Sequence, residues 1–109
     1  MIRIYNKLVR DKIVDKIEAR GELAEYRTLS DEEYRAELIA KMHEETSEFE
    51  NDNTLAELGD MYGVLCAIVE HSGYTMDEVL KTAEEKENKN GGFRKRIFLK
   101  SWNDRGILR

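Results

Sequence analysis

The chain has 109 residues, of which 38% are charged and none is proline, and its formal net charge is −5. This length predicts one domain, residues 1–109, and the 40% of hydrophobic residues suffice for a folded core. The sequence has no apolar run of the roughly 18 residues that a membrane-spanning helix needs, and its N-terminus has no apolar signal-peptide core. The one cysteine, Cys66, excludes an intrachain disulfide framework. We therefore expect a cytoplasmic protein without a membrane partner.

The first predicted element is a helix over roughly residues 7–20. Apolar residues such as Ile13 and Ile17 recur there near helical spacing, and Gly21 follows as a C-cap. Residues 24–29, which come next, are a loop or one short strand.

Three capping boxes predict the starts of three further helices. The boxes are Ser30 with Glu33, Thr54 with Glu57, and Thr75 with Glu78. These helices should end near residues 50, 71 and 89, the last before a Gly-Gly turn. A short apolar piece, residues 97–99, then lies between basic residues as a strand or a docking tail.

The second predicted helix carries a carboxylate in its apolar stripe. On a helical wheel, Leu38, Met42 and Phe49 form one stripe, and Glu45 falls in its middle. Glu48 lies at the edge of the stripe and Glu44 beyond it. A buried charge of this kind is costly unless a partner compensates it.

The third predicted helix repeats the pattern. Its residues 61–69 are apolar nearly all round, which indicates a central helix. Glu57 and Asp60 precede this run one turn apart, on a side otherwise occupied by apolar residues. These two acids are therefore also expected to face protein.

The two helices together predict a cation site. Antiparallel pairing across the short polar turn would bring their acids together, and converging carboxylates cannot all ionise without a cation between them. Oxygen ligands suit Mg²⁺, with Mn²⁺ as the alternative. The competing interpretation is a solvated, Glu-rich helix surface.

These motifs resemble the MazG-like all-α nucleoside triphosphate pyrophosphohydrolases, whose E-x-x-E and E-x-x-D helices match Glu45–Glu48 and Glu57–Asp60. The opening YNKLVRDKI and the late KNGGFRKRIFL resemble a small phosphoribosyl-ATP pyrophosphohydrolase-like branch. Val14 stands where that branch usually has proline, which removes a helix-start signal and no chemistry.

The resemblance implies Mg²⁺-dependent hydrolysis of a nucleoside triphosphate, ribo or deoxy, to the monophosphate and pyrophosphate. It makes Glu45, Glu48, Glu57 and Asp60 the metal ligands. Glu44, together with Glu45, is expected to act on the attacking water. Metal ions in such sites neutralise phosphate charge and acidify water.

The charges of the chain are unevenly distributed. Residues 1–20 carry +3, residues 21–85 carry −14 and residues 86–109 carry +6. The basic ends are expected to bind the substrate phosphates through Lys and Arg. The candidates are Lys86, Lys89, Arg94, Lys7 and Arg10. The acidic centre argues against a nucleic-acid partner.

We expect an all-α fold, an antiparallel bundle of about four helices with a short basic C-terminal tail. A chain of this length has too few elements to bury its apolar helix, so we expect completion by homo-oligomerisation, as a homodimer or a dimer of dimers. Two alternatives stay open. One is a phosphoribosyl-ATP pyrophosphohydrolase, and the other is a nucleotide-sensing or protein-binding helical module with weak or no catalysis.

Overall fold

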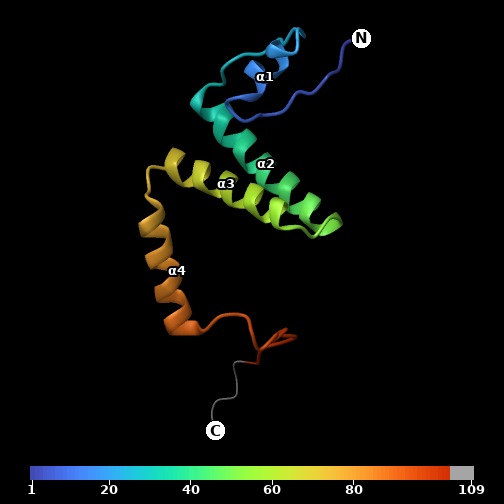
Figure 1. The fold of residues 1–109 in the computed structure, drawn as a ribbon. Coiled ribbons are helices and arrows are strands. Elements are labelled where there is room, and N and C mark those ends of the chain that lie inside the picture. Colours follow the sequence, from blue (N-terminus) through green and yellow to red (C-terminus); the bar gives the residue numbers. More distant parts are fainter. Residues whose placement is uncertain (104–109) are drawn as a thin grey trace. The chain divides into compact units, whose positions relative to one another are not determined.

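The computed structural model describes residues 1–103, and its regular secondary structure in this range is helical (Figure 1). The described part of the chain holds four helices and no strand. In chain order they are α1 (Ile13–Ala19), α2 (Asp31–Asn51), α3 (Leu55–His71) and α4 (Met76–Asn90). None of these helices combines the length and apolarity that a membrane crossing requires. The predicted all-α class is confirmed.

The chain divides into two compact units, residues 1–76 and 77–109. The first unit holds α1, α2 and α3, and the second begins at Asp77, one residue into α4. The single domain expected over residues 1–109 stays a prediction, as do the oligomer and the role of the basic tail.

The helices α2 and α3 start where the capping signals place them. The Ser30 hydroxyl accepts a hydrogen bond from the Glu33 backbone N–H at 3.2 Å, and the Glu33 carboxylate accepts one from the Ser30 N–H at 3.2 Å. At the start of α3, the Thr54 hydroxyl accepts from the Glu57 N–H at 3.3 Å. These bonds satisfy N–H groups that have no partner within the helix.

Glycines with positive φ end α1 and α3. Gly73 has φ 85°, its N–H donates to the Glu70 carbonyl at 3.1 Å, and the Tyr74 N–H donates to the Val69 carbonyl at 3.1 Å. This pair of bonds is a Schellman motif, which needs a left-handed residue that glycine adopts without strain. Gly21, with φ 82°, ends α1 in the same way, as predicted, although the C-cap itself is the preceding Arg20.

The first helix starts later than expected. The first helix begins at Ile13 and not near residue 7, so its predicted start was wrong. The stretch before Ile13 is irregular: Asn6 is left-handed at φ 49°, a conformation that an α-helix does not contain, and the side chains of Lys7 and Arg10 pair with acids of α2 and α3. Residues 24–29 form a loop, and residues 97–99 are irregular and exposed.

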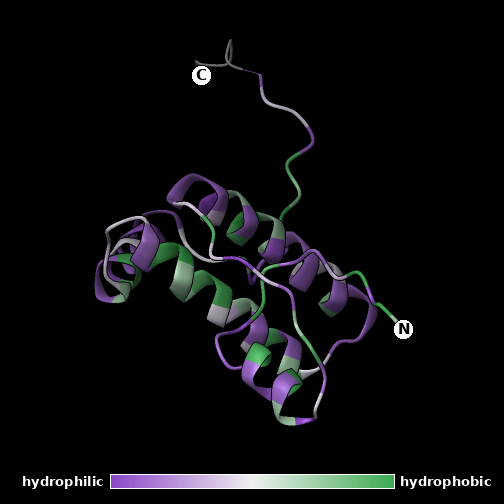
Figure 2. Ribbon diagram, turned by 90° about the horizontal axis from the view of Figure 1, so that it is seen from above, coloured by the Kyte–Doolittle hydropathy of each residue, from purple (hydrophilic) through white to green (hydrophobic). Residues whose placement is uncertain are grey.

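The core of the first unit lies between α2 and α3, which pack against each other and run in opposite directions across the turn at residues 52–54 (Figure 1). Leu38 on α2 and Val69 on α3 are its buried apolar residues, at 3% and 7% exposure. Other apolar residues of α3, including Leu58 and Tyr62, are 45% and 57% exposed. The hydropathy of the helices can be followed along the ribbon in Figure 2.

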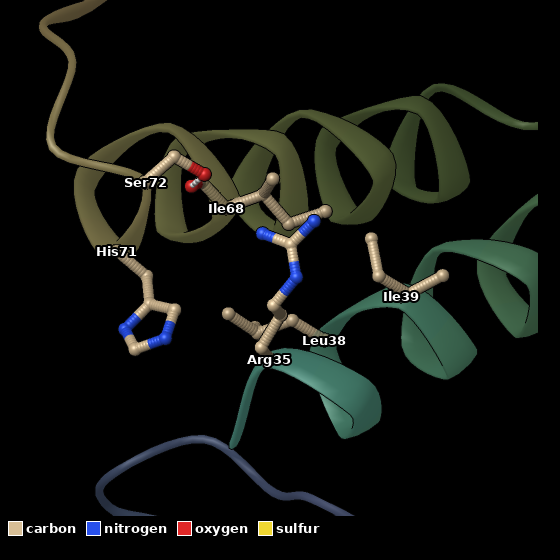
Figure 3. A pocket seen from close by; sticks show the side chains of 6 residues that line it. All are labelled: Arg35, Leu38, Ile39, Ile68, His71 and Ser72. Atoms are coloured by element: carbon tan, nitrogen blue, oxygen red, sulfur yellow. Dashed lines mark hydrogen bonds between the residues drawn. The ribbon is translucent and has the colours of Figure 1, made fainter. Parts of the chain in front are cut away.

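A small hollow between α2 and α3 is lined by Arg35, Leu38 and Ile39 of α2 and by Ile68, His71 and Ser72 of α3 and its C-cap (Figure 3). Its volume is about 10 Å³, which is room for one water molecule at most. The hollow therefore does not bind a nucleotide. The His71 ring meets the Tyr34 ring edge to face, with centroids 5.0 Å apart, and helps to close this end of the helix pair.

Candidate metal centre

Three carboxylates converge at the end of the α2–α3 pair that lies near the connecting turn. Glu45 comes from α2, and Glu57 and Asp60 come from α3. One carboxylate oxygen from each lies within 4.8 Å of the other two. The structure thus brings together three of the four acids that the sequence assigns to a metal, and we call these three the acid triad.

Two oxygens of the acid triad are buried without a partner. Glu45 is 6% exposed, in the middle of the α2 stripe where the wheel places it. Glu45 Oε2 and Glu57 Oε2 have no hydrogen-bond partner within residues 1–103. A buried carboxylate oxygen without a donor is unfavourable, and a bound cation would satisfy it.

The charges of the acid triad repel one another. Burial, followed by repulsion from Glu48 and Asp60, raises the pKa of Glu45 above its ordinary value. Burial and the same two neighbours also raise the pKa of Glu57. Both shifts indicate that these carboxylates are poorly solvated and that neighbouring negative charge adds to the cost of ionising them.

Glu48 lies beside the acid triad and not within it. Its side chain is exposed on α2, although its charge acts on Glu57. Its predicted role as a metal ligand stays a prediction, and the exposed position suits a ligand at the open side of a site.

Glu44 is held between two lysines. Lys7 Nζ lies 3.0 Å from its Oε2, and Lys41 Nζ lies 3.3 Å from its Oε1. The hydrogen bond from Lys7 is the main cause of the lowered pKa of Glu44. A carboxylate held in this way is a weak proton acceptor, so this geometry suits orienting a water better than deprotonating it.

Lys41 also contributes to the site, although it belongs to none of the sequence motifs. Besides Glu44 it faces Glu45, whose Oε1 lies 3.8 Å from Lys41 Nζ. The i, i+3 and i, i+4 spacing from Lys41 to these acids was the available signal.

The N-terminal residues reach the same site. Arg10 Nη2 donates to Asp60 Oδ1 at 3.0 Å, and Lys7 pairs with Glu44 as described. The Lys7 ammonium also lies 5.4 Å from the centre of the Tyr5 ring, within range of a cation–π contact. The hydrogen bond to Glu44 raises the pKa of Lys7, which favours the positively charged form of this side chain. Two cations predicted to bind phosphate therefore contact the acids.

The other predicted phosphate ligands lie in the second unit. Lys86 and Lys89 are exposed on α4, and Arg94 is exposed after the glycine turn that ends this helix. Their phosphate-binding role stays a prediction.

The donor set of the acid triad fits a hard divalent cation. All available ligand atoms are carboxylate oxygens, which Mg²⁺ and Mn²⁺ prefer, and the described chain places neither His nor Cys among them. Mg²⁺ in proteins is commonly held by few carboxylates and several waters, so three acids on two helices are enough.

Comparison with known proteins gives one partial relative. The chain is 48% identical over 48 residues to an uncharacterized protein of Mycolicibacterium smegmatis. The matched stretch covers 44% of this chain and 49% of that protein, so it spans about half of the relative. No protein-family model matches the chain. No solved structure matches it.

Proposed function

We propose that this protein is a Mg²⁺-dependent nucleoside triphosphate pyrophosphohydrolase, which cleaves an NTP or dNTP to the monophosphate and pyrophosphate. The observation that carries the proposal is the convergence of Glu45, Glu57 and Asp60 from two helices, with buried and unpartnered oxygens on two of them. Burying a carboxylate costs free energy that a solvated acidic surface does not compensate, whereas a cation bound in a metal site does.

In this proposal the acid triad, with Glu48 at its open side, holds the metal. When bound, Mg²⁺ supplies charge neutralisation for the phosphates and acidifies a water. Glu44 stays ionised because two lysines hold it, and its carboxylate orients the attacking water toward the α-phosphorus.

The basic residues are proposed to bind the phosphates of the substrate. Lys86, Lys89 and Arg94 carry charges that match the β- and γ-phosphates, which become the leaving pyrophosphate. Arg10 and Lys7 are further phosphate ligands, although both are paired with carboxylates in this structure.

A homo-oligomer belongs to the proposal. Ile39 of α2 is 41% exposed, and Leu58 and Tyr62 of α3 are about half exposed, so a second copy has an apolar surface to cover. We propose a homodimer or a dimer of dimers that buries these residues. Light scattering after gel filtration tests this, and a monomer at all concentrations would contradict it.

The function is tested by measuring pyrophosphate release from a panel of NTPs, dNTPs and phosphoribosyl-ATP, with and without Mg²⁺. We expect release that requires the metal. Release from phosphoribosyl-ATP alone would assign the more specialised activity. Nucleotide binding without release from any substrate would favour a sensing module over an enzyme.

Matched variants link the activity to the site. Glu48→Gln should abolish turnover while leaving the helices and the oligomer intact. Glu50→Gln, two residues further along α2 and also exposed, is the control and should retain turnover. Full activity in Glu48→Gln would remove this residue from the proposed site.

A further inference from the structure

A short basic stretch of the chain lies against the proposed metal centre. Residues 7–10, which we call the N-terminal segment, are irregular and contribute two cations, Lys7 toward Glu44 on α2 and Arg10 toward Asp60 on α3. The segment thereby joins both helices through their acids.

Arg10 lies closely against α3. A Cβ added to Gly63 would stand 3.3 Å from Arg10 Nη2, which is closer than side chains ordinarily pack, and 3.7 Å from Nη1, which is an ordinary contact. Gly63 is in the middle of α3, where glycine weakens a helix. The absence of a side chain at this position lets the guanidinium approach the helix beside Asp60.

The Arg10–Asp60 ion pair is nevertheless an easily exchanged contact. The Arg10 side chain is 67% exposed, and ion pairs this open contribute little net stability. Arg10 also satisfies only part of the site, since Glu45 Oε2 and Glu57 Oε2 stay without a partner in the described chain. Arg10 contacts Asp60 of the acid triad, whereas a divalent cation would bring twice the charge to all three carboxylates.

We propose that Arg10 is the exchangeable counterion of the metal-free acid triad, and that its guanidinium leaves Asp60 when a divalent cation binds and becomes available to a phosphate oxygen. This inference rests on the proposed metal-dependent function. It gives the binding events an order, because Arg10 is free to bind substrate only after the metal has entered. Arg10 thus competes with the metal for Asp60, and it binds a phosphate of the substrate once the metal has displaced it.

Calorimetric titration of the full chain with Mg²⁺ alone tests the exchange. Arg10→Gln removes the competing charge, so it should bind Mg²⁺ about fivefold more tightly than the unaltered protein at low ionic strength. Arg10→Lys keeps the charge and should bind within about twofold of the unaltered protein. Arg20→Gln is the matched control with unchanged affinity, because Arg20 is 65% exposed and pairs with Glu22.

Side-chain NMR of the unaltered protein gives a second readout. The Arg10 guanidinium signals, assigned by their loss in Arg10→Lys, should change from a restrained to a freely rotating pattern as Mg²⁺ saturates the protein. Weaker binding by Arg10→Gln, or unchanged Arg10 signals at saturation, would overturn the inference and leave the metal site standing. Failure of the unaltered protein to bind Mg²⁺ or Mn²⁺ would overturn both.

Discussion

Arg10 and Asp60 are 50 positions apart in the sequence, and the guanidinium of one lies 3.0 Å from the carboxylate of the other. This ion pair connects the irregular N-terminal residues to α3, and the Lys7–Glu44 pair connects them to α2. The N-terminal segment is therefore part of the candidate site, where its cations offset some of the charge of the acids.

Two glycines of α3 should respond differently to alanine. Gly59→Ala should raise the free energy of unfolding by about 1 kcal/mol, because alanine favours a helix and the added Cβ meets nothing within 4 Å. Gly63→Ala gains the same propensity but displaces Arg10, so its increase should be smaller by about 0.5 kcal/mol. Urea denaturation measures both, and equal increases would show that Arg10 does not depend on Gly63.

Replacing Glu45 should improve stability at the expense of function. Glu45→Leu removes a buried charge from the apolar stripe of α2, so the metal-free protein should gain about 1 kcal/mol in unfolding free energy. Mg²⁺ binding and pyrophosphate release should be lost. Denaturation and calorimetry measure the two effects.

The control for Glu45 is an exposed acid on the same helix. Glu50→Leu should change stability by less than about 0.5 kcal/mol and leave Mg²⁺ binding unaltered. A net loss of stability in Glu45→Leu would mean that the metal-free protein already compensates the buried carboxylate, which would remove the main reason for placing a cation beside it.

Acid should weaken the start of α2 through Glu33. Its hydrogen bonds from Arg27, with those from Ser30, lower the pKa of Glu33 from 4.5 to about 2. The native state therefore binds fewer protons here than the unfolded chain, so this contribution is complete above pH 4.5 and is lost as the pH falls toward 2. Glu33→Gln should remove that part of the pH dependence.

Urea midpoints at pH 3 and pH 7 measure this effect. Glu32→Gln, which removes a charge from the same first turn but leaves the Arg27–Glu33 pair, is the matched control. If Glu33→Gln and the unaltered protein lost the same stability between these pH values, the capping pair would not be responsible.

Divalent cations should stabilise the protein against heat. A ligand that binds only the native state adds about 2.7 kcal/mol at 100 times its dissociation constant, so the melting temperature should rise with Mg²⁺ and fall again with a chelator. Asp60→Asn should abolish this rise, because it removes one of the three converging carboxylates. A rise that persists in Asp60→Asn would place the metal elsewhere.

The sequence predicted the helices better than it predicted their surroundings. Capping signals at Ser30 and Thr54 are local, and they located the starts of α2 and α3. The burial of Glu45 followed from the helical period alone, since its neighbours on the stripe are apolar.

The contacts of the N-terminal segment could not be predicted from local sequence patterns. The helical spacing of the neighbouring apolar residues predicts Lys7 and Arg10 within a helix, whereas both lie in an irregular stretch where they pair with acids distant in the sequence. Tertiary ion pairs of this kind leave no mark in spacing or propensity. A mid-helix glycine such as Gly63 can mark the approach of another group, but Gly59 in the same helix has nothing within 4 Å, so the residue type alone did not locate Arg10.

The most direct test of the proposed function is ³¹P NMR of the unaltered protein with a nucleoside triphosphate substrate identified in the release screen. We predict that pyrophosphate and nucleoside monophosphate appear together in Mg²⁺, that both stop accumulating when a chelator is added, and that neither forms with Glu45→Leu. Orthophosphate as the product, or pyrophosphate formation that continues without a divalent cation, would contradict a metal-dependent pyrophosphohydrolase.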